Sequence, residues 1–322
     1  MDARRSQWSR IAYLGPAGTF TEEALLGEED LAAAELITAP TIEDALAAAA
    51  AGEVDAAFVP IENSIEGSIS ATLDRLVFGE ELLVQREVVL DVHLHLLVAP
   101  GTRVDDLERV QSYPPALAQC RDYLARRLPG VRQVATTSTA EAARLVAEEA
   151  AGAPDKVVSV AAVAPIAAAK LYGLDAVESE IEDYGANQTR FVLVAPTSVP
   201  APTGHDRTLL VCFQHENRPG SLLEILSRFA ARRLSLTRLV SRPTKEALGE
   251  YCFVIEVEGH IADELLGDCL AELHQSLKAL RFLGSYPVSG VAASARRAEV
   301  DQRRREARAW LEAMRARLRS GP

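Results

Sequence analysis

The stretch Arg10-Ile11-Ala12-Tyr13-Leu14-Gly15-Pro16-Ala17-Gly18-Thr19-Phe20-Thr21, followed by Glu22-Glu23, decides the fold class. Its apolar first half predicts a short buried strand, its glycines predict a tight turn, and a helical pattern begins at Glu22. Thr19 or Thr21 can cap this helix. Such a turn directs backbone N–H groups and hydroxyls towards an anion, although a plain strand–helix turn has the same pattern. The stretch is neither a P-loop nor a GxGxxG dinucleotide turn.

Strand–loop–helix units of this kind recur as far as residue 196. Further strands are predicted at residues 54–60, 82–90, 92–98, 110–112, 133–139 and 157–162. Polar clusters follow several of them, as in Pro60-Ile61-Glu62-Asn63-Ser64 and Thr136-Thr137-Ser138-Thr139. The rhythm predicts parallel α/β layers, with a ligand crevice at the carboxyl ends of the strands. The long segment Leu82–Val98 is expected to cross between two lobes, which would form a cleft.

The pattern changes after a Pro-rich linker at residues 197–205. Residues 206–287 contain a strand, a helix, two strands, a helix and a last strand, which predicts a ferredoxin-like βαββαβ unit. The turn at Gly220 could receive a carboxylate. Residues 293–319 predict an amphipathic helix that packs on its own protein or on a partner subunit, with nucleic-acid binding as the weaker alternative.

Composition excludes several classes of function. The chain has 322 residues and a formal net charge of −12, so a nucleic-acid partner is not expected and an anionic ligand would need a locally positive pocket. No apolar run is long enough for a transmembrane helix, and Met1–Trp8 lacks an apolar signal core, so we expect a cytoplasmic protein with no membrane contact. The four cysteines form no CxxC pair and are typical of reduced thiols.

The stretch Asn187-Gln188-Thr189-Arg190-Phe191 places a hydroxyl, a cation and an aromatic ring where a loop enters a buried strand. Successive strand residues point to opposite faces, so Thr189 and Phe191 should share one face and Arg190 should occupy the other. An exposed arginine that caps a strand is the simpler interpretation. His93 and His95 could form a metal pair only with a third ligand, and Cys120 is more typical of a buried helix cysteine than of a nucleophile.

Together these motifs resemble a known family. Four of them, in this order and spacing, resemble prephenate dehydratases: Gly15-Pro16-x-Gly18-Thr19-Phe20, Pro60-Ile61-Glu62-Asn63-Ser64, Ala118-Gln119-Cys120 and Thr189-Arg190-Phe191. The later unit resembles an ACT domain, an amino-acid-sensing module, through Gly220-Ser221-Leu222-Leu223 and Ser241-Arg242-Pro243. The resemblance implies a two-lobed catalytic domain like a periplasmic binding protein at residues 10–196, and an ACT regulatory domain at residues 206–287.

The resemblance also implies a reaction, the loss of carbon dioxide and water from prephenate to give phenylpyruvate in phenylalanine biosynthesis. Because the product ring is aromatic, no metal or redox cofactor is expected for this carbon–oxygen lyase. Thr189 would donate a hydrogen bond to the leaving hydroxyl, and Arg190 would grip a carboxylate. If both enter one cleft, the backbone there must depart from regular strand geometry. Phe191 is expected more to pack in the lobe than to touch substrate.

The remaining site residues follow from the same resemblance. The expected neutral donors to a dianionic substrate are Thr19, Asn63, Ser64, Ser112, Thr137 and Ser138. Glu62 would be repelled by that substrate, so we expect it to orient other groups, with a protonated Glu62 acting as general acid as the alternative. The family's usual Ser-His-Pro-Gln reads Ser112-Tyr113-Pro114-Pro115 here, so no histidine or glutamine role is carried over.

Regulation by L-phenylalanine is implied through the ACT unit. The expected effector residues are Asn217, Gly220, Ser221, Leu222, Leu223, Ser241, Arg242 and Pro243. Val240 stands where the family usually has glutamate, which weakens the expected binding. ACT modules pair between subunits, so a homo-oligomer, a dimer or a tetramer, is implied, and the protein is expected to be monofunctional. An arogenate dehydratase and a non-catalytic ligand-binding sensor stay open as alternatives, whereas a decarboxylase without aromatisation is disfavoured.

Overall fold

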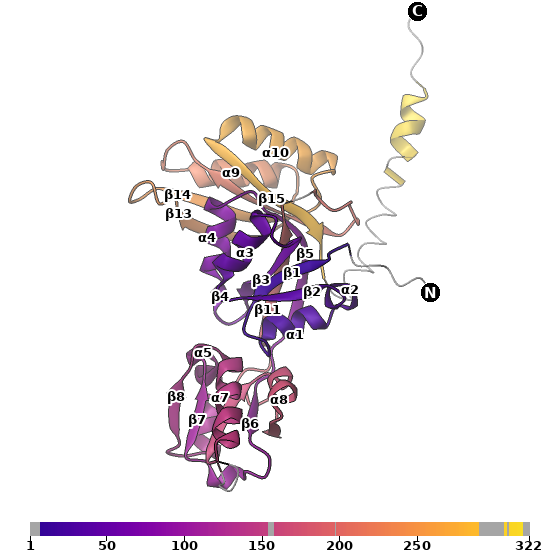
Figure 1. Ribbon diagram of the computed structural model, residues 1–322. Helices are drawn as coiled ribbons and strands as arrows, with labels where there is room; N and C mark the ends of the chain where they lie inside the picture. The colour runs from indigo at the N-terminus through magenta and orange to yellow at the C-terminus, as the bar shows by residue number, and fades with distance from the viewer. Residues whose placement is uncertain (1–6, 154–157, 197, 290–305, 308, 318–322) are drawn as a thin grey trace, which may run out of the picture. The chain divides into compact units, whose positions relative to one another are not determined.

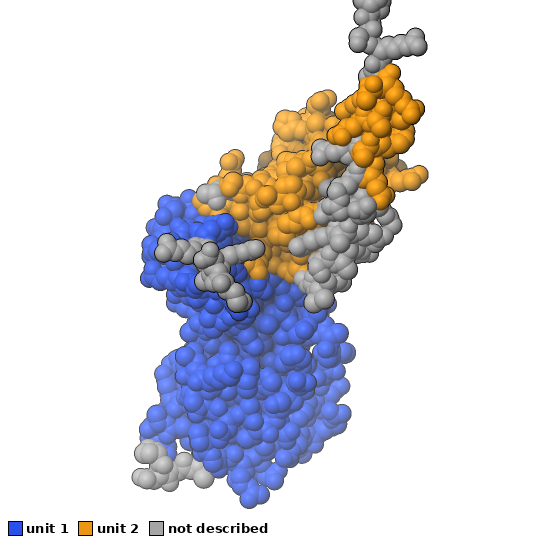
Figure 2. All heavy atoms as spheres, turned by 90° about the vertical axis from the view of Figure 1, so that its right-hand side faces the viewer, with its two compact units in different colours: residues 1–75, 88–193 blue, residues 76–87, 194–322 orange. Residues whose placement is uncertain are grey.

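The computed structural model describes residues 7–153, 158–196, 198–289, 306–307 and 309–317. These residues form two compact units, which Figure 2 shows in different colours. Unit 1 comprises residues 1–75 and 88–193, and unit 2 comprises residues 76–87 and 194–322. Unit 1 contains most of two α/β lobes. Unit 2 contains an antiparallel sheet with two helices, together with residues 76–87, which belong to a helix and a strand of the first lobe.

The first lobe is built on a sheet with strand order β2-β1-β3-β11-β5, and β4 pairs with β3 at its end (Figure 1). Its strands are β1 (Arg10–Leu14), β2 (Glu35–Ala39), β3 (Ala56–Asn63), β4 (Gly67–Ser68), β5 (Leu83–Asp91) and β11 (Gln188–Ala195). Its helices are α1 (Phe20–Leu26), α2 (Glu29–Ala32), α3 (Ile42–Ala50) and α4 (Ser70–Phe78). Because β1 pairs in parallel with both β2 and β3, the polar residues that follow these strands gather at one edge.

The second lobe is built on a sheet with strand order β10-β6-β9-β7-β8. Its strands are β6 (His95–Val98), β7 (Arg109–Ser112), β8 (Arg132–Ala135), β9 (Val160–Ala164) and β10 (Asp175–Glu178). Its helices are η1 (Val104–Asp106), α5 (Pro114–Gln119), α6 (Arg121–Arg127), α7 (Thr139–Ala151) and α8 (Ile166–Tyr172). Strand β9 is buried along its whole length, because hydrophobic clusters cover both faces of the sheet.

The chain passes between the two lobes twice, at residues 92–94 and again at residues 179–187. The two passages are hydrogen-bonded to each other, since Val92 N donates to Asn187 O (2.8 Å) and Ile181 N donates to Leu94 O (2.8 Å). This double crossing confirms the predicted two-lobed arrangement of the periplasmic-binding-protein kind. The sheets are mixed rather than purely parallel, because β6 runs antiparallel to both β9 and β10.

Unit 2 contains the predicted ferredoxin-like domain. Its elements are β12 (Asp206–Phe213), α9 (Ser221–Ala231), β13 (Leu236–Pro243), β14 (Tyr251–Glu258), α10 (Glu264–Ser276) and β15 (Ala279–Pro287). The strand order is β13-β14-β12-β15, and each pairing is antiparallel. Helices α9 and α10 pack on one face through Ile225, Phe229 and Leu266. Gly284 allows close packing of β15 on residues 76–87, because a Cβ there would lie 2.6 Å from Val84 O.

Several boundaries differ from those predicted. Strand β3 runs three residues beyond Pro60, so Glu62 and Asn63 are strand residues that point to opposite faces. Helix α1 begins at Phe20, so Thr19 rather than Thr21 is its N-cap. Strands β2 and β10 were not predicted. Most of the predicted helix at 293–319 lies outside the described residues, and in its described part Trp310 is exposed.

No helix among the described residues combines the length and the apolar character needed to cross a membrane.

Candidate active site

A pocket of about 460 Å³ lies in unit 1 and is lined by residues of both lobes. Pockets of this size are typical of sites for small molecules. The residues that line it are Leu14, Gly15, Pro16, Thr19, Phe20, Thr21, Pro40, Ile42, Pro60, Asn63, Glu66, Ile69, Val92, Leu94, Tyr113, Pro115, Ala116, Gln119, Thr137, Ser138, Thr139, Asn187, Thr189 and Phe191. The wall therefore combines an apolar surface with neutral donors and acceptors.

Helix N-termini lie at the wall of this pocket. Helix α7 begins at Thr139 with Ser138 as its N-cap, and α3 begins at Ile42. Residues of both first turns line the pocket, and the starts of the shorter helices α1 and α5 line it too. The first N–H groups of a helix have no partner within the helix, and the helix dipole favours a negative charge there. Of the described residues that line the pocket, none is lysine, arginine or histidine, and Glu66 is the single carboxylate.

Thr189 and Asn63 meet on the pocket wall. Thr189 is the second residue of β11, Asn63 is the last residue of β3, and Asn63 Nδ2 lies 3.0 Å from Thr189 Oγ1. The orientation of the Asn63 amide is fixed, because its Oδ1 accepts the backbone N–H groups of Ile65 (2.9 Å) and Glu66 (3.0 Å). Its Nδ2 must therefore donate to Thr189 Oγ1. The Thr189 hydroxyl hydrogen is left to donate elsewhere, and the pocket lies on this side of the strand.

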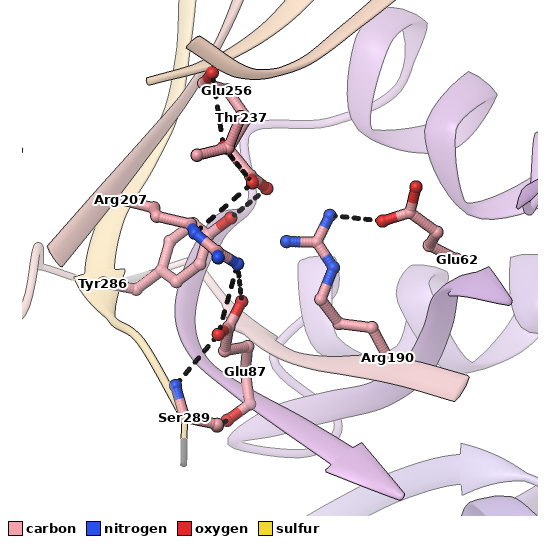
Figure 3. A network of polar contacts seen from close by, with 8 residues as sticks. All are labelled: Glu62, Glu87, Arg190, Arg207, Thr237, Glu256, Tyr286 and Ser289. Carbon is pink, nitrogen blue, oxygen red and sulfur yellow. Dashed lines mark hydrogen bonds and ion pairs between the residues drawn. The ribbon is translucent and has the colours of Figure 1, made fainter. Parts of the chain in front are cut away.

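Arg190 occupies the opposite face of β11 from Thr189. It is 9% exposed, and its Nη2 lies 2.8 Å from Glu62 Oε2 (Figure 3). Neither Arg190 nor Glu62 lines the pocket. Regular strand alternation explains this placement, so the predicted irregularity that would bring Thr189 and Arg190 into one cleft is not needed. The geometry supports the orienting role expected for Glu62, with Arg190 as its partner, and does not support a grip of Arg190 on substrate.

The other predicted residues divide between the pocket and its support. Thr19, Asn63, Thr137, Ser138 and Phe191 line the pocket. Phe191 is also 1% exposed and stacks on Phe58 with ring centroids 5.3 Å apart, so it packs in the lobe and contributes to the wall.

Ser64 and Ser112 do not line the pocket. Ser64 Oγ donates to Ala186 O (3.0 Å) and accepts from Gln188 N (2.9 Å), which joins the end of β3 to the start of β11. Ser112 is fully buried and donates to Val163 O. Both hydroxyls are used in holding the backbone around the pocket.

The histidine and cysteine alternatives find no support in the geometry. Cys120 is buried, and burial raises the pKa of its thiol, which disfavours the thiolate nucleophile. The hydrogen bond that His93 donates to the Glu182 carboxylate raises the pKa of His93, whereas burial lowers the pKa of His95. The described residues contain no group of three or more His, Cys, Asp or Glu side chains that could hold a metal ion.

The predicted effector residues lie in unit 2, at two places in the ferredoxin-like domain. Gly220 has a φ of 88° and precedes α9, Asn217 Nδ2 donates to Gly249 O (2.9 Å), and Leu223 is 68% exposed. Leu222 packs against the domain core. The second group, Ser241, Arg242 and Pro243, ends β13.

A buried polar network stabilises the sheet of unit 2. Arg207 Nη1 lies 3.1 Å from Glu87 Oε2, and Arg207 Nε lies 3.6 Å from Glu256 Oε1 (Figure 3). Tyr286 and Thr237 donate hydrogen bonds to the Glu256 carboxylate (2.9 and 2.6 Å). Both glutamates are 1% exposed, so these partners offset the cost of burying their charges.

Sequence reasoning assigned no role to Asn187, Gln119 and Glu66, which line the pocket. Two of them lie in motifs already singled out, Ala118-Gln119-Cys120 and Asn187–Phe191. Glu66 follows the Pro60–Ser64 motif by two residues. Asn187 directly precedes the buried strand β11, and this position could have identified it, whereas Gln119 ends helix α5 and had only its motif as a signal.

The fold and the pocket define a class of protein, a two-lobed α/β protein with a pocket lined by apolar and mainly uncharged polar residues, followed by a ferredoxin-like domain. Comparison with family models makes the class specific. The model described as prephenate dehydratase matches residues 11–198, and that of the ACT domain matches residues 208–275. The chain belongs to the prephenate dehydratase family.

Curated relatives agree with this assignment. The chain is 44% identical to a prephenate dehydratase of Amycolatopsis methanolica, over 95% of this chain and 98% of that protein. It is 42% identical to a prephenate dehydratase of Mycobacterium tuberculosis H37Rv, over 97% of this chain and 94% of that protein.

Solved structures are also similar. A prephenate dehydratase from Arthrobacter aurescens in complex with L-Phe superposes with a TM-score of 0.79 at 38% identity, covering 95% of this chain and 99% of that chain. GqqA, described as a novel type of quorum quenching acylase, superposes with a TM-score of 0.77 at 29% identity, covering 87% and 98% of the two chains.

Proposed function

We propose that this chain converts prephenate to phenylpyruvate, carbon dioxide and water, and that the Asn63–Thr189 pair in the pocket carries the chemistry. Family membership and relatives more than 40% identical over nearly the whole chain support a carbon–oxygen lyase. The observation that carries the proposal is the hydroxyl of Thr189, which accepts from Asn63 and is therefore set to donate into the pocket.

In this reaction the ring carboxylate leaves as carbon dioxide, and the electron pair of the broken C–C bond enters the ring. The same electron flow breaks the ring C–O bond, so hydroxide leaves and is protonated to water with a proton from solvent. Aromaticity of the product supplies the driving force. Thr189 donates a hydrogen bond to the departing hydroxyl, and the donated hydrogen bond from Asn63 makes the Thr189 hydroxyl a better donor.

The dianionic substrate is held by neutral groups rather than by a cation. The starts of α3 and α7 line the pocket, and so do Thr19, Thr137 and Ser138. Fixed dipoles of this kind stabilise an anion in a site shielded from water. We assign Phe191 and the apolar wall to the ring, and Arg190, Glu62, Ser64 and Ser112 to support of the pocket.

The ACT domain is proposed to bind L-phenylalanine and to regulate the enzyme. The similar structure from Arthrobacter aurescens was solved in complex with L-Phe, which supports this ligand class. The proposed contacts are Asn217, Gly220, Ser221, Leu222, Leu223, Ser241, Arg242 and Pro243. Exposed Leu223 and Leu239 support pairing of this domain between subunits, in a homo-oligomer. If millimolar phenylalanine gives no heat in calorimetry and no change in activity, this part of the proposal fails.

We further propose the domain boundaries 10–196 for the catalytic domain and 206–287 for the regulatory domain, with a linker at 197–205 and a C-terminal helix at 293–319. A cytoplasmic location is proposed because the four cysteines are buried and, among the described residues, none is in a disulfide, as is typical of reducing compartments.

Turnover tests the function directly. Prephenate and arogenate are supplied side by side, and the prephenate reaction is repeated with phenylalanine. Phenylpyruvate from prephenate is read by its ultraviolet absorbance in alkali, and phenylalanine from arogenate is read by amino-acid chromatography. Prephenate should give phenylpyruvate. Turnover of arogenate alone would identify an arogenate dehydratase, and no product from either substrate would leave a ligand-binding sensor.

A further inference from the structure

Glu66 places a carboxylate on the wall of the pocket that we propose binds a dianion. Glu66 lines the pocket, and at close range its negative charge would oppose the binding of a dianion. It lies three residues after the end of β3 and is exposed, so solvent screens part of this repulsion. Its recorded side-chain partner is Gln119 Nε2, which donates to Glu66 Oε1 over 3.2 Å. Gln119 ends helix α5 of the second lobe, so this hydrogen bond joins the two lobes.

From Gln119 a chain of amide hydrogen bonds leads to Thr189. Asn187 Nδ2 donates to Gln119 Oε1 (2.8 Å), and Asn63 Nδ2 donates to Asn187 Oδ1 (2.9 Å) and to Thr189 Oγ1 (3.0 Å). Asn187 is 3% exposed, so its amide cannot exchange these partners for water without cost. We call this set, the three amide side chains of Gln119, Asn187 and Asn63 with the carboxylate of Glu66 at its end, the amide relay.

The direction of every hydrogen bond in the amide relay is fixed from both ends. At one end two backbone N–H groups hold Asn63 Oδ1, so the Asn63 amide must present its N–H groups to Asn187 and Thr189. At the other end the carboxylate of Glu66 can only accept while it is ionised, so Gln119 must present its N–H group to it. Both requirements orient the Asn187 amide in the same way: its Nδ2 donates to Gln119, and its Oδ1 accepts from Asn63. Hydrogen bonds aligned in one direction polarise one another.

We propose that Glu66 is a positioning residue, which acts through Gln119 and Asn187 to hold Thr189 as a hydrogen-bond donor when the two lobes are closed around substrate. The inference rests on the proposed function and deepens it. Glu66 holds the Gln119 amide against Asn187, Asn187 accepts one N–H of Asn63, and Asn63 donates to one lone pair of Thr189. Because the relay spans both lobes, opening of the cleft would break the hydrogen bond between Gln119 and Glu66, whereas the hydrogen bond from Asn63 to Thr189 lies within the first lobe.

The test compares Glu66→Gln, Gln119→Leu and the double variant with the wild type. Glu66→Gln retains shape and should lower kcat about 10-fold while KM stays within about twofold, because the effect falls on the transition state. In the Gln119→Leu background the same change should have no further effect on kcat. Glu29→Gln, which removes an exposed carboxylate from α2, is the matched control and should leave both parameters unchanged.

Two outcomes would overturn the proposal. Additive losses in the double variant, or a change confined to KM, would mean that Glu66 acts directly on substrate. Unchanged kcat for Glu66→Gln would remove it from the mechanism.

A readout without turnover separates this proposal from the proposed function. With ¹⁵N-asparagine labelling, the side-chain amide signals of Asn63 and Asn187 should shift in Glu66→Gln and not in Glu29→Gln. Unmoved signals would contradict the relay even if the enzyme is active, and a wild type that makes no phenylpyruvate would contradict the function even if the signals move.

Discussion

The two faces of strand β11 carry different kinds of side chain. Thr189 and Phe191 face the pocket with a neutral hydroxyl and a ring, whereas Arg190 faces away and pairs with Glu62 at 2.8 Å. The charged residues of this motif therefore support the wall, and the uncharged residues form it. A neutral wall suits a reaction whose driving force lies in the substrate, because the protein needs to bind and orient rather than to supply strong acids or bases.

The same division recurs on the first passage between the lobes. Val92 and Leu94 line the pocket, and His93 between them is directed to Glu182 instead. On both segments the alternation of an extended chain separates the pocket side from the side that carries ion pairs. The comparison predicts that changes on the pocket face alter turnover, and that changes on the other face alter stability.

The largest expected effect is on the pocket face. Thr189→Ala should lower kcat by at least ~100-fold and leave KM nearly unchanged, because the lost hydrogen bond acts on the leaving hydroxyl in the transition state. Steady-state kinetics with prephenate measures it. Thr189→Ser, which keeps the hydroxyl, is the control and should retain most of the activity. A Thr189→Ala enzyme with near-wild-type kcat would remove Thr189 from the chemistry.

The sequence alone was sufficient to predict the α/β layers and the uncharged polar residues that line the pocket. The strand–loop–helix rhythm placed Thr19, Asn63, Thr137 and Ser138 at strand ends, and parallel strands bring such ends together. The alternation rule even predicted Arg190 on the other face. The family resemblance then led us to place Arg190 at the substrate.

Long-range partners decide the rest of the site and leave no local pattern in the sequence. Glu62 and Arg190 are 128 residues apart, and nothing near either of them indicates the pairing. The helix N-termini that replace the expected cation also depend on how two lobes face one pocket. Only the tertiary arrangement brings α3 and α7 to the same site.

The second prediction concerns the other face of β11. Arg190→Met should lower the free energy of unfolding by roughly 1–3 kcal/mol, because the carboxylate of Glu62 loses a largely buried partner. The KM for prephenate should change less than about threefold. Chemical denaturation and steady-state kinetics measure the two quantities.

A double change sharpens this prediction. Adding Glu62→Leu to Arg190→Met removes both charges and should restore part of the lost stability, since a partly buried carboxylate that has lost an ion-pair partner is less favourable than an apolar side chain. If Arg190 instead gripped a substrate carboxylate, Arg190→Met would raise KM about 100-fold, given the strength of bidentate charge-assisted hydrogen bonds. That outcome would overturn the division between the two faces.

The smallest expected effect concerns His93, on the first passage between the lobes. It is the pH dependence of the stability that the His93–Glu182 pair contributes. The hydrogen bond that His93 Nδ1 donates to Glu182 Oε1 (2.9 Å) raises the pKa of His93 above its ordinary value. A raised pKa in the folded state means that this pair stabilises the protein fully below the ordinary histidine pKa of about 6.5, and that the contribution is lost as pH rises through the folded-state pKa. His93→Gln should therefore lower Tm more at pH 6 than at pH 8. His93 is 42% exposed, so solvent screens the pair and the difference should stay below about 1 kcal/mol. The substitution should leave turnover unchanged at both pH values, because His93 points away from the pocket. A loss of kcat that follows the protonation of His93 would show that this side chain takes part in the reaction.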